Sequence, residues 1–395
     1  MRRIVVVGGS QAGVHAIAQL RQEGYEHEIT LVDADGHLPY DRPPLSKEAL
    51  FSAVEHETLL HGPEWYEQND VSLRLGVSAV KLHPNDRELT LETGDVIRYD
   101  GMVIATGSRA RRLDAGSSEI PIYALRTLDD AIKLRHQMTP GKRLLVIGAG
   151  FIGLEVASSA RQLGLDVTVI DAAPAPLSRA FGEDLGKWFR RLHERNGVEV
   201  RCATTIKSMD GSGTGVSVSM NSGKKLFVDL IVVGIGATPA IDWLTGSGLK
   251  IGNGISCESD LRTSAPDVVA AGDVARWYNP IFDEEMRVEH WTNAVEQGRH
   301  AAATLLGSRD AFNSVPYFWT DQFDAKMRFV GRVDAADDVL IERESDDRLV
   351  ALFGRDGLVR GAACINAPRQ LALYRKAILD QVPWSEVAGN HLKAS

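Results

Sequence analysis

The segment from residue 143 to residue 171 reads RLLVIGAGFIGLEVASSARQLGLDVTVID. The apolar run Arg143–Ile147 is typical of a strand that is buried on both faces of a parallel sheet. The glycine-rich turn at residues 148–153 follows, and we expect a helix over residues 154–163 and a second strand over residues 167–170. Strand, glycine-rich turn, helix and strand in this order predict a Rossmann-like unit that binds a dinucleotide.

Each fingerprint position has a physical task. Gly148 permits the tight turn, Gly150 lets the backbone approach a pyrophosphate, and Gly153 lets the helix pack closely on the strand. Asp171 closes the second strand, where a carboxylate can accept hydrogen bonds from ribose hydroxyls. It favours the bare 2′-hydroxyl of NADH over the 2′-phosphate of NADPH, although Arg179 lies nearby in the sequence and weakens that argument.

A second unit of the same kind opens the chain. Its parts are a strand at Ile4–Val7, the turn GGSQAG at residues 8–13, a helix at Val14–Glu23, a strand at Glu28–Val32 and the terminal acid Asp33. Ser10 stands where the middle glycine is expected, so this turn alone would be a weak signal. Two such units 140 residues apart indicate two dinucleotides, or one dinucleotide and a decayed repeat.

Composition narrows the class of protein. The chain has 395 residues, which suggests two or three domains, and no apolar stretch approaches the ~20 residues that span a bilayer. Its net charge of −9 disfavours nucleic acid as a partner. The three cysteines, Cys202, Cys257 and Cys364, form no C-x-x-C motif, so we expect neither a redox disulfide nor a metal site. These features predict a cytoplasmic protein with no membrane contact.

Several further segments carry a resemblance to a known family. They are LPYDRPPLSK at residues 38–47, VIATGS at 103–108, LRTLDDA at 125–131, VGIGATP at 233–239, AGDVA at 271–275, WTNA at 291–294 and FWTDQ at 318–322. With them the chain resembles the FAD-dependent NAD(P)H reductases of 2Fe–2S ferredoxins, of the putidaredoxin reductase and biphenyl dioxygenase ferredoxin reductase type. The match runs along nearly the whole chain.

The resemblance implies an α/β fold with two Rossmann-like dinucleotide-binding domains, as in glutathione reductase, and a C-terminal α+β interface domain. The implied boundaries are 1–110 and 237–308 for a discontinuous FAD domain, 111–236 for the NADH domain and 309–395 for the C-terminal domain. The sequence agrees with the last assignment. Strand-like runs fill residues 339–365, with a turn at 355–357, and a helix-like stretch follows at residues 369–380.

The resemblance also implies two sets of cofactor residues. For FAD they are Gly8, Ser10, Ala12, Gly13, Asp33, Arg42, Lys47, Val80, Thr106, Gly107, Arg126, Asp273 and Trp291. For NADH, with NADPH disfavoured, they are Gly148, Gly150, Ile152, Gly153, Glu155, Asp171, Arg179 and Gly236. Among these, Asp273 fits the ribityl chain, Val80 would border the adenine, and the indole of Trp291 would lie near the flavin ring.

Lys47 and Glu155 are the implied catalytic residues. Lys47 would lie close to the reacting edge of the flavin and pair with Glu155, which we expect at the start of a helix, where it would feel the helix dipole. The alternative is an ion pair that is only structural. Trp319 is a candidate for the electron exit or for an ordinary core residue.

The implied activity is hydride transfer from NADH to FAD, then single-electron transfer to a 2Fe–2S ferredoxin that serves a P450 or a ring-hydroxylating dioxygenase. We expect a transient, electrostatic complex and a monomer or weak homodimer. Two basic clusters are candidate docking sites: Arg109, Arg111 and Arg112, and Arg369, Arg375 and Lys376, where Arg369 and Lys376 would share a helix face. Two alternatives stay open: a reductase of a quinone, radical or oxygen, and a redox-sensing flavoprotein resembling apoptosis-inducing factor.

Overall fold

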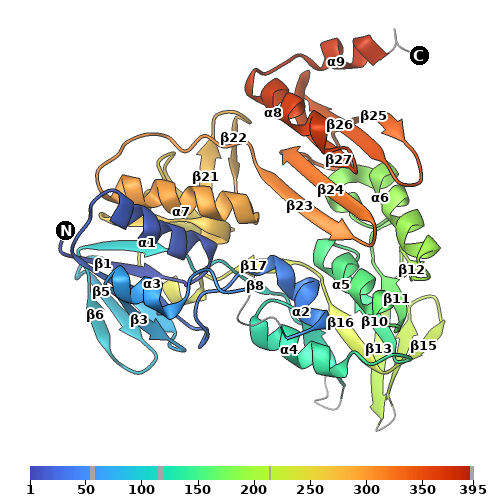
Figure 1. The fold of residues 1–395 in the computed structure, drawn as a ribbon, viewed down its shortest axis with the longest axis horizontal. Helices are drawn as coiled ribbons and strands as arrows, with labels where there is room; N and C mark the ends of the chain where they lie inside the picture. The colour runs from blue at the N-terminus through green and yellow to red at the C-terminus, as the bar shows by residue number, and fades with distance from the viewer. Residues whose placement is uncertain (54–57, 114–119, 213–214, 392–395) are drawn as a thin grey trace. The chain divides into compact units, whose positions relative to one another are not determined.

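The computed structural model describes residues 1–53, 58–113, 120–212 and 215–391. They form two compact units (Figure 1). Unit 1 comprises Met1–Asp41, His56–Arg109 and Thr238–Tyr317, and unit 2 comprises Arg42–Glu55, Ala110–Ala237 and Phe318–Ser395. The segment that carries Lys47 therefore clusters with unit 2, and the division into three domains stays a prediction.

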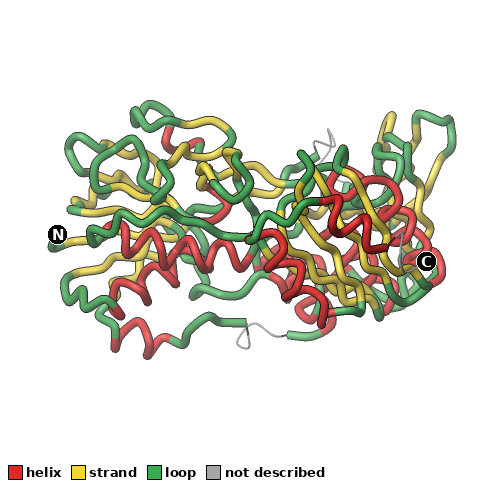
Figure 2. Tube along the Cα trace, turned by 90° about the horizontal axis from the view of Figure 1, so that it is seen from above, coloured by secondary structure: helices red, strands yellow, loops and turns green. Residues whose placement is uncertain are grey.

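Unit 1 is built on a five-stranded parallel sheet. Its strands, in spatial order, are β20 (Val268–Ala270), β7 (Gly101–Ile104), β1 (Arg3–Val7), β2 (Glu28–Asp33) and β3 (Val71–Leu75). Helices α1 (Gln11–Gln22) and α7 (Trp291–Leu305) lie side by side on one face of the sheet (Figures 1 and 2). Because both faces of β1 are covered, all of Ile4–Val7 is buried, as the unbroken apolar run predicts.

Two smaller sheets complete unit 1. One contains β4 (Ala79–His83), β5 (Glu88–Leu91) and β6 (Val96–Arg98), and the other contains β18 (Ile251–Gly252), β19 (Gly254–Cys257), β21 (Ala275–Asn279) and β22 (Glu284–Met286). Short helical segments are α3 (Pro63–Gln68), η2 (Asp242–Leu244) and η3 (Gly272–Val274). A single apolar cluster joins β5, β7 and β19 through Leu89, Ile104 and Ile255, so these sheets share one core.

Unit 2 repeats the parallel architecture. Its strands, in spatial order, are β12 (Glu199–Arg201), β11 (Asp166–Ile170), β10 (Arg143–Ile147), β16 (Leu230–Val233) and β9 (Ile122–Ala124). Its helical elements are η1 (Pro43–Ser46), α2 (Glu48–Phe51), α4 (Leu128–Gln137), α5 (Phe151–Gln162) and α6 (Ser178–Arg195). The antiparallel sheet of β13 (Ile206–Ser212), β14 (Gly215–Met220) and β15 (Lys225–Val228) covers part of it, and Leu145, Val218 and Ile231 belong to the core between them.

A five-stranded sheet forms the C-terminal part of unit 2. Its order is β23 (Tyr317–Gln322), β24 (Ala325–Gly331), β27 (Leu358–Ile365), β26 (Leu349–Arg355) and β25 (Asp338–Glu344), and η4 (Pro368–Gln370), α8 (Leu371–Leu379) and α9 (Trp384–His391) follow. The prediction that Arg369 and Lys376 share one face of a single helix is wrong. Pro368 starts a separate 3-10 turn that holds Arg369, and α8 begins only after it. Lys376 is paired with Asp380.

The strands β8 (Ser108–Ala110) and β17 (Ala237–Pro239) form a further two-stranded sheet.

Both fingerprint helices begin three residues earlier than predicted. Helix α1 starts at Gln11 and α5 at Phe151, so the last fingerprint glycine, Gly13 or Gly153, lies inside the first helical turn. The apolar periodicity, which guided the prediction, does not begin until after that glycine. Across the described parts of the chain, no helix combines the length and the apolar character needed to cross a membrane.

Candidate active site

The glycine turn between β10 and α5 has three different steric environments. Gly148 has φ +105°, and a Cβ there would lie 2.3 Å from the carbonyl oxygen of Gly234. A Cβ on Gly153 would lie 2.1 Å from the carbonyl oxygen of Gly148, so only glycine lets the helix reach the strand. A Cβ on Gly150 would meet nothing nearer than 3.8 Å. The protein itself does not require glycine at position 150, which leaves close approach of a ligand as the reason for it.

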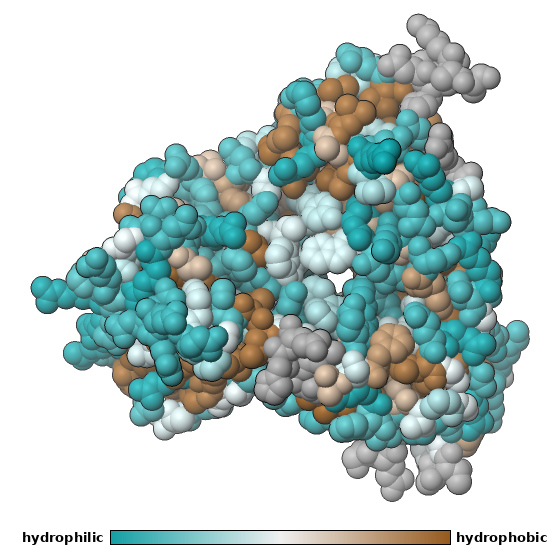
Figure 3. Space-filling model, viewed as in Figure 1, coloured by the Kyte–Doolittle hydropathy of each residue, from teal (hydrophilic) through white to brown (hydrophobic). Residues whose placement is uncertain are grey.

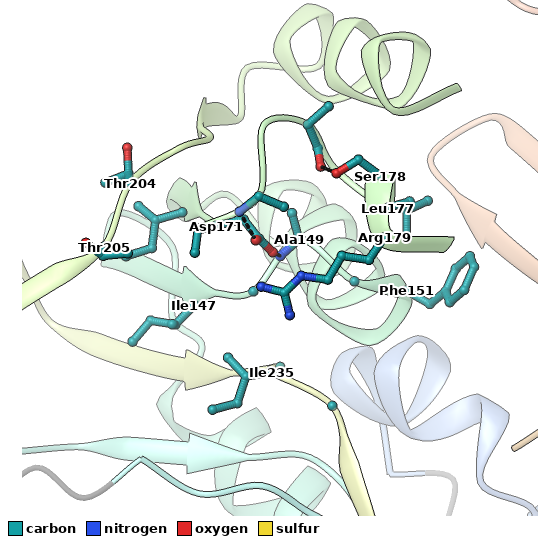
Figure 4. Close-up of a pocket in the computed structure, with 18 of the residues that line it drawn as sticks. Ile147, Ala149, Phe151, Asp171, Leu177, Ser178, Arg179, Thr204, Thr205 and Ile235 are labelled. Atoms are coloured by element: carbon teal, nitrogen blue, oxygen red, sulfur yellow. Dashed lines mark hydrogen bonds between the residues drawn. The ribbon is translucent and has the colours of Figure 1, made fainter. Parts of the chain in front are cut away.

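A cavity of about 480 Å³ opens in front of this turn (Figure 4). Its lining includes residues 147–151 of the turn, Asp171, Leu177, Ser178 and Arg179, Thr204 and Thr205, and residues 234–236. Five predicted NADH residues therefore meet at one cavity: Gly148, Gly150, Asp171, Arg179 and Gly236. The other three, Ile152, Gly153 and Glu155, do not line it. The size, the backbone N–H groups at the start of α5 and the acid at the end of β11 fit the adenosine and pyrophosphate part of a dinucleotide.

The two strand-terminal acids hold their own glycine turns. Asp171 Oδ2 accepts a hydrogen bond of 2.6 Å from the Ala149 N–H, as drawn in Figure 4, and its Oδ1 accepts one of 2.7 Å from the Ala173 N–H. In unit 1, Asp33 Oδ2 likewise accepts a 2.9 Å bond from the Gly9 N–H. A carboxylate has about four acceptor sites, so ribose binding remains compatible with these bonds. The sequence predicted the acids but not that they fix the turns.

The turn between β1 and α1 has the same construction in unit 1. Gly8 has φ +110°, and a Cβ on Gly13 would lie 2.0 Å from the carbonyl oxygen of Gly8. Ser10 is the N-cap residue of α1, the place that Gly150 takes before α5. A Cβ at that place in the second turn meets no described protein atom nearer than 3.8 Å, so a serine is compatible with this backbone conformation. The Ser10 side chain leaves less room for a pyrophosphate than Gly150 does, and the N–H groups at the start of α1 remain available to bind one.

Ala12, on the other side of this turn, is closely surrounded. A Cβ on Gly272 would lie 3.1 Å from the Ala12 Cβ, and one on Gly298 would lie 2.2 Å from its carbonyl oxygen. Glycines at these two positions bring η3 and α7 against the start of α1. The side-chain oxygen of Gln11 and the side-chain nitrogen of Gln297 are buried there without a hydrogen-bond partner among the described residues. Buried polar atoms normally have partners, so a polar ligand such as FAD fits this region.

Trp291 is held by a hydrogen bond rather than by packing alone. Its indole N–H donates to Asp41 Oδ1 at 2.7 Å, and the amide of Gln11 donates to the same oxygen at 2.8 Å. Asp41 thus joins the start of α1 and the start of α7 within unit 1. The resemblance implied a place near the flavin for Trp291 but no role for Asp41.

The other residues of unit 1 that were predicted to bind FAD differ in their hydrogen bonds and exposure. Asp273 accepts a 2.7 Å hydrogen bond from the Ser108 hydroxyl, and the Thr106 hydroxyl donates to the Ala240 carbonyl at 2.9 Å. Gly107 has φ +66°, which lets the chain turn after β7. Val80 is 44% exposed on β4. The role of each in binding FAD stays a prediction.

Lys47 and Glu155 meet in unit 2. Lys47 Nζ lies 3.0 Å from Glu155 Oε1, and the two side chains are 17% and 8% exposed. The Ser46 hydroxyl donates to Glu155 Oε2 at 2.5 Å, and the Thr320 hydroxyl donates to Oε1 at 2.7 Å. Nearby in the same unit, Arg42 and Arg126 are joined because the Arg42 guanidinium donates to the Arg126 carbonyl at 2.7 Å.

The expected effect of the helix dipole on Glu155 is wrong. Glu155 is the fifth residue of α5 and lies beyond the first turn, where the dipole acts. Its charge is instead compensated by one ammonium and two hydroxyl groups. A buried ion pair is costly unless it is fully hydrogen-bonded, and both carboxylate oxygens have donors here.

His193, on α6, was not singled out in the sequence. It is fully buried, and its Nε2 lies 2.9 Å from the side-chain oxygen of Gln322. Burial lowers the pKa of His193 from 6.5 to about 4. Because a lone histidine on an amphipathic helix gives no distinctive pattern, only the structure identifies it.

This histidine makes the fold sensitive to acid. The unfolded chain binds the His193 proton more readily than the native state, so native stability falls as the pH drops from 6.5 towards about 4. We expect a contribution of about 3 kcal/mol over that range. In urea unfolding of the apoprotein, His193→Gln should lose that much less stability on acidification than the wild type. Equal losses in the two proteins would contradict the assignment.

Comparison with known proteins places these features in a family. The model of the pyridine nucleotide-disulphide oxidoreductases matches residues 2–298, and that of the reductase C-terminal domain matches residues 317–389. The chain belongs to the pyridine nucleotide-disulphide oxidoreductase family. Its fold, with two Rossmann-like sheets and a C-terminal α+β part, confirms the predicted class.

Ferredoxin reductases are among the similar proteins of this family. Rhodocoxin reductase of Rhodococcus erythropolis is 35% identical over 96% of this chain and 90% of the relative. The ferredoxin–NAD(+) reductase component of the anthranilate 1,2-dioxygenase system of Burkholderia cepacia is 35% identical over 95% and 93%. The reductase in a covalent putidaredoxin reductase–putidaredoxin complex superposes with a TM-score of 0.92, at 31% identity, over 97% of this chain and 94% of that one. The resemblance drawn from the sequence motifs is confirmed.

Proposed function

We propose that this protein is an FAD-dependent reductase that takes reducing equivalents from NADH and delivers single electrons to a 2Fe–2S ferredoxin of a P450 or dioxygenase system. The observation that carries the proposal is the presence of two glycine-rich turns of the dinucleotide-binding type in a chain that is similar to ferredoxin reductases over 95% or more of its length. FAD, when bound, supplies the step from a two-electron donor to a one-electron acceptor. The chain supplies binding and charge.

The cysteines support direct exit of electrons from the flavin. Cys202, Cys257 and Cys364 are all free thiols, so none of them forms the disulfide used by other members of the family. Burial raises the pKa of each thiol, and that of Cys364 to about 12. Protonated thiols are poor nucleophiles, so a thiol relay is disfavoured.

The role that we propose for each unit follows from its own residues. In unit 1, the turn before α1 would bind the FAD pyrophosphate, Asp33 its ribose and Asp273 its ribityl chain. In unit 2, the cavity at Gly150 would bind NADH. Lys47, oriented by Glu155, would place a positive charge beside the reacting part of the flavin.

Acceptor specificity is the test of this function. With NADH and purified FAD-loaded protein, reduction of cytochrome c should be slow and should become fast only when a 2Fe–2S ferredoxin is added. Fast reduction of a quinone or of oxygen without ferredoxin would instead support the small-acceptor reductase.

Coenzyme preference tests Asp171. We expect kcat/KM for NADH to exceed that for NADPH by about tenfold or more, because the Asp171 carboxylate repels a 2′-phosphate. Asp171→Asn should reduce this ratio, mainly by improving the use of NADPH. A wild-type ratio near one, or one that favours NADPH, would refute the proposed preference for NADH.

The partner complex is proposed to be transient and electrostatic, with a cytoplasmic monomer or weak dimer as the working form. Arg375 on α8 is exposed, and so are Leu373 and Leu379. Hydrophobic side chains gather on the part of unit 2 that carries α8 (Figure 3). If the charge of Arg375 or of the arginines at 109–112 steers the ferredoxin, the rate of turnover with ferredoxin should fall as ionic strength rises.

A further inference from the structure

A chain of buried polar side chains runs through unit 2 and ends at Glu155. The Thr320 hydroxyl lies 2.7 Å from Glu155 Oε1, and the Gln322 amide nitrogen lies 3.1 Å from that hydroxyl. His193 Nε2 lies 2.9 Å from the Gln322 amide oxygen. Glu155 is 7% exposed, Thr320 and Gln322 are each 1% exposed, and His193 is fully buried. These contacts are therefore shielded from bulk solvent.

The hydrogen atoms of this chain have a defined direction. The amide oxygen of Gln322 faces His193, so His193 Nε2 must carry the proton. The Gln322 amide donates to Thr320, and the single hydroxyl hydrogen of Thr320 is then available for Glu155. Every donor points towards the carboxylate, and such bonds strengthen one another. The neutral state of His193 suits this arrangement, because no described residue accepts a hydrogen bond from its buried Nδ1.

Strand β23 delivers the central part of the chain. Side chains alternate along a strand, so Thr320 and Gln322 share one face, whereas Trp319 and Asp321 lie on the other. The buried face thus reaches α5 through Glu155 and α6 through His193. The backbone N–H of Phe323, just after β23, also donates to the Ser158 hydroxyl on α5 at 2.8 Å.

We propose that Thr320, supported by Gln322 and His193, is a positioning residue for Glu155. Its hydroxyl holds the Glu155 carboxyl group in the orientation that meets Lys47 on one side and Ser46 on the other. The consequence for catalysis rests on the proposed role of the Lys47–Glu155 pair. The hydrogen-bond geometry from His193 to Glu155 does not depend on that role.

The first test uses NMR of the apoprotein and needs no activity. Nitrogen-15 signals of His193 should show the Nε2-protonated tautomer, and the Nδ1-protonated tautomer would overturn the proposed direction. In protein labelled with carbon-13 at the glutamate carboxyl carbons, the signal of Glu155 is identified as the one that is missing in the Glu155→Gln variant. The chemical shift of this signal should change in Thr320→Val. It should return to the wild-type value in Thr320→Ser, which restores the hydroxyl. An unchanged signal in Thr320→Val would overturn the proposal.

The second test uses FAD-loaded protein and stopped-flow flavin reduction. Thr320→Val should lower the limiting rate at saturating NADH about tenfold, as expected for loss of one hydrogen bond to a charged group, with the Kd for NADH unchanged. Thr320→Ser should recover most of the rate. The matched control is Thr304→Val in unit 1, which removes another buried hydroxyl, one that donates to the Asp260 carbonyl, and should leave the rate unchanged.

The outcomes separate this inference from the proposed function. If flavin in the Glu155→Gln variant is reduced at the wild-type rate, the proposed catalytic role of the ion pair is wrong. The NMR result still tests the hydrogen bonds that run from His193 to Glu155. If Glu155→Gln is slow and Thr320→Val has the wild-type rate, the positioning role of Thr320 fails. A double variant no slower than Glu155→Gln alone supports action through Glu155.

Discussion

Lys47→Met is expected to lower the limiting rate of flavin reduction at saturating NADH by about 100-fold. The Lys47 ammonium is largely shielded from water and fixed by Glu155 at 3.0 Å and by the Pro43 carbonyl at 3.3 Å. A fixed charge in a water-poor site stabilises developing negative charge, and removing one such group commonly costs 10²-fold or more, about 3 kcal/mol. Methionine keeps the apolar stem, so packing changes little.

Stopped-flow absorbance under anaerobic conditions measures this rate. Lys187→Met is the matched control, because Lys187 is an exposed residue that pairs with Asp184 on α6, and its rate should be that of the wild type. Flavin content should be equal in the wild type and both variants. A wild-type rate in Lys47→Met would mean that the ion pair is structural only.

Gly150→Ala and Gly153→Ala are expected to fail in different ways. A methyl group at position 150 meets no protein atom closer than 3.8 Å, so folding should be normal. It occupies the space through which a pyrophosphate must approach, and we expect the KM for NADH to rise by about 10- to 100-fold. At position 153 the methyl group would lie 2.1 Å from the Gly148 carbonyl oxygen. The helix must shift, and we expect a loss of about 2 kcal/mol in stability.

Steady-state kinetics and denaturant unfolding of the two variants measure these effects. Ser10→Gly is a useful companion, because Ser10 takes the equivalent place in the first turn, and it should leave the KM for NADH unchanged. A Gly150→Ala protein with normal KM would contradict the assignment of the cavity to NADH. A Gly153→Ala protein as stable as the wild type would contradict the packing role of that glycine.

The sequence predicted the parts of the fold whose signals are local. The strand at Arg143–Ile147 was placed correctly, because buried parallel strands are unbroken apolar runs. The starts of α1 and α5 were missed by three residues, since the fingerprint glycines Gly13 and Gly153 read as turn although they lie in helices. The helix predicted over 369–380 begins only at Leu371, because Pro368 starts a 3-10 turn that holds Arg369.

The surroundings of the ion pair could not be predicted in this way. Lys47 and Glu155 were paired by resemblance, and the structure brings them together. Thr320 and His193 are far from Glu155 along the chain, and their contact depends on how β23 and α6 pack on α5. No periodicity in one segment encodes such a contact. One local signal was present: Thr320 and Gln322 alternate with Trp319 and Asp321 along β23, so the side chains of Thr320 and Gln322 share one face of the strand.

The central claim, that this chain holds two different dinucleotides and moves electrons from one to the other, is tested by titration of the apoprotein with FAD followed by anaerobic NADH. We predict that the chain retains one FAD and that the flavin absorbance bleaches when NADH is added. Protein that retains no FAD, or whose bound FAD keeps its oxidised spectrum in excess NADH and NADPH, would contradict the account.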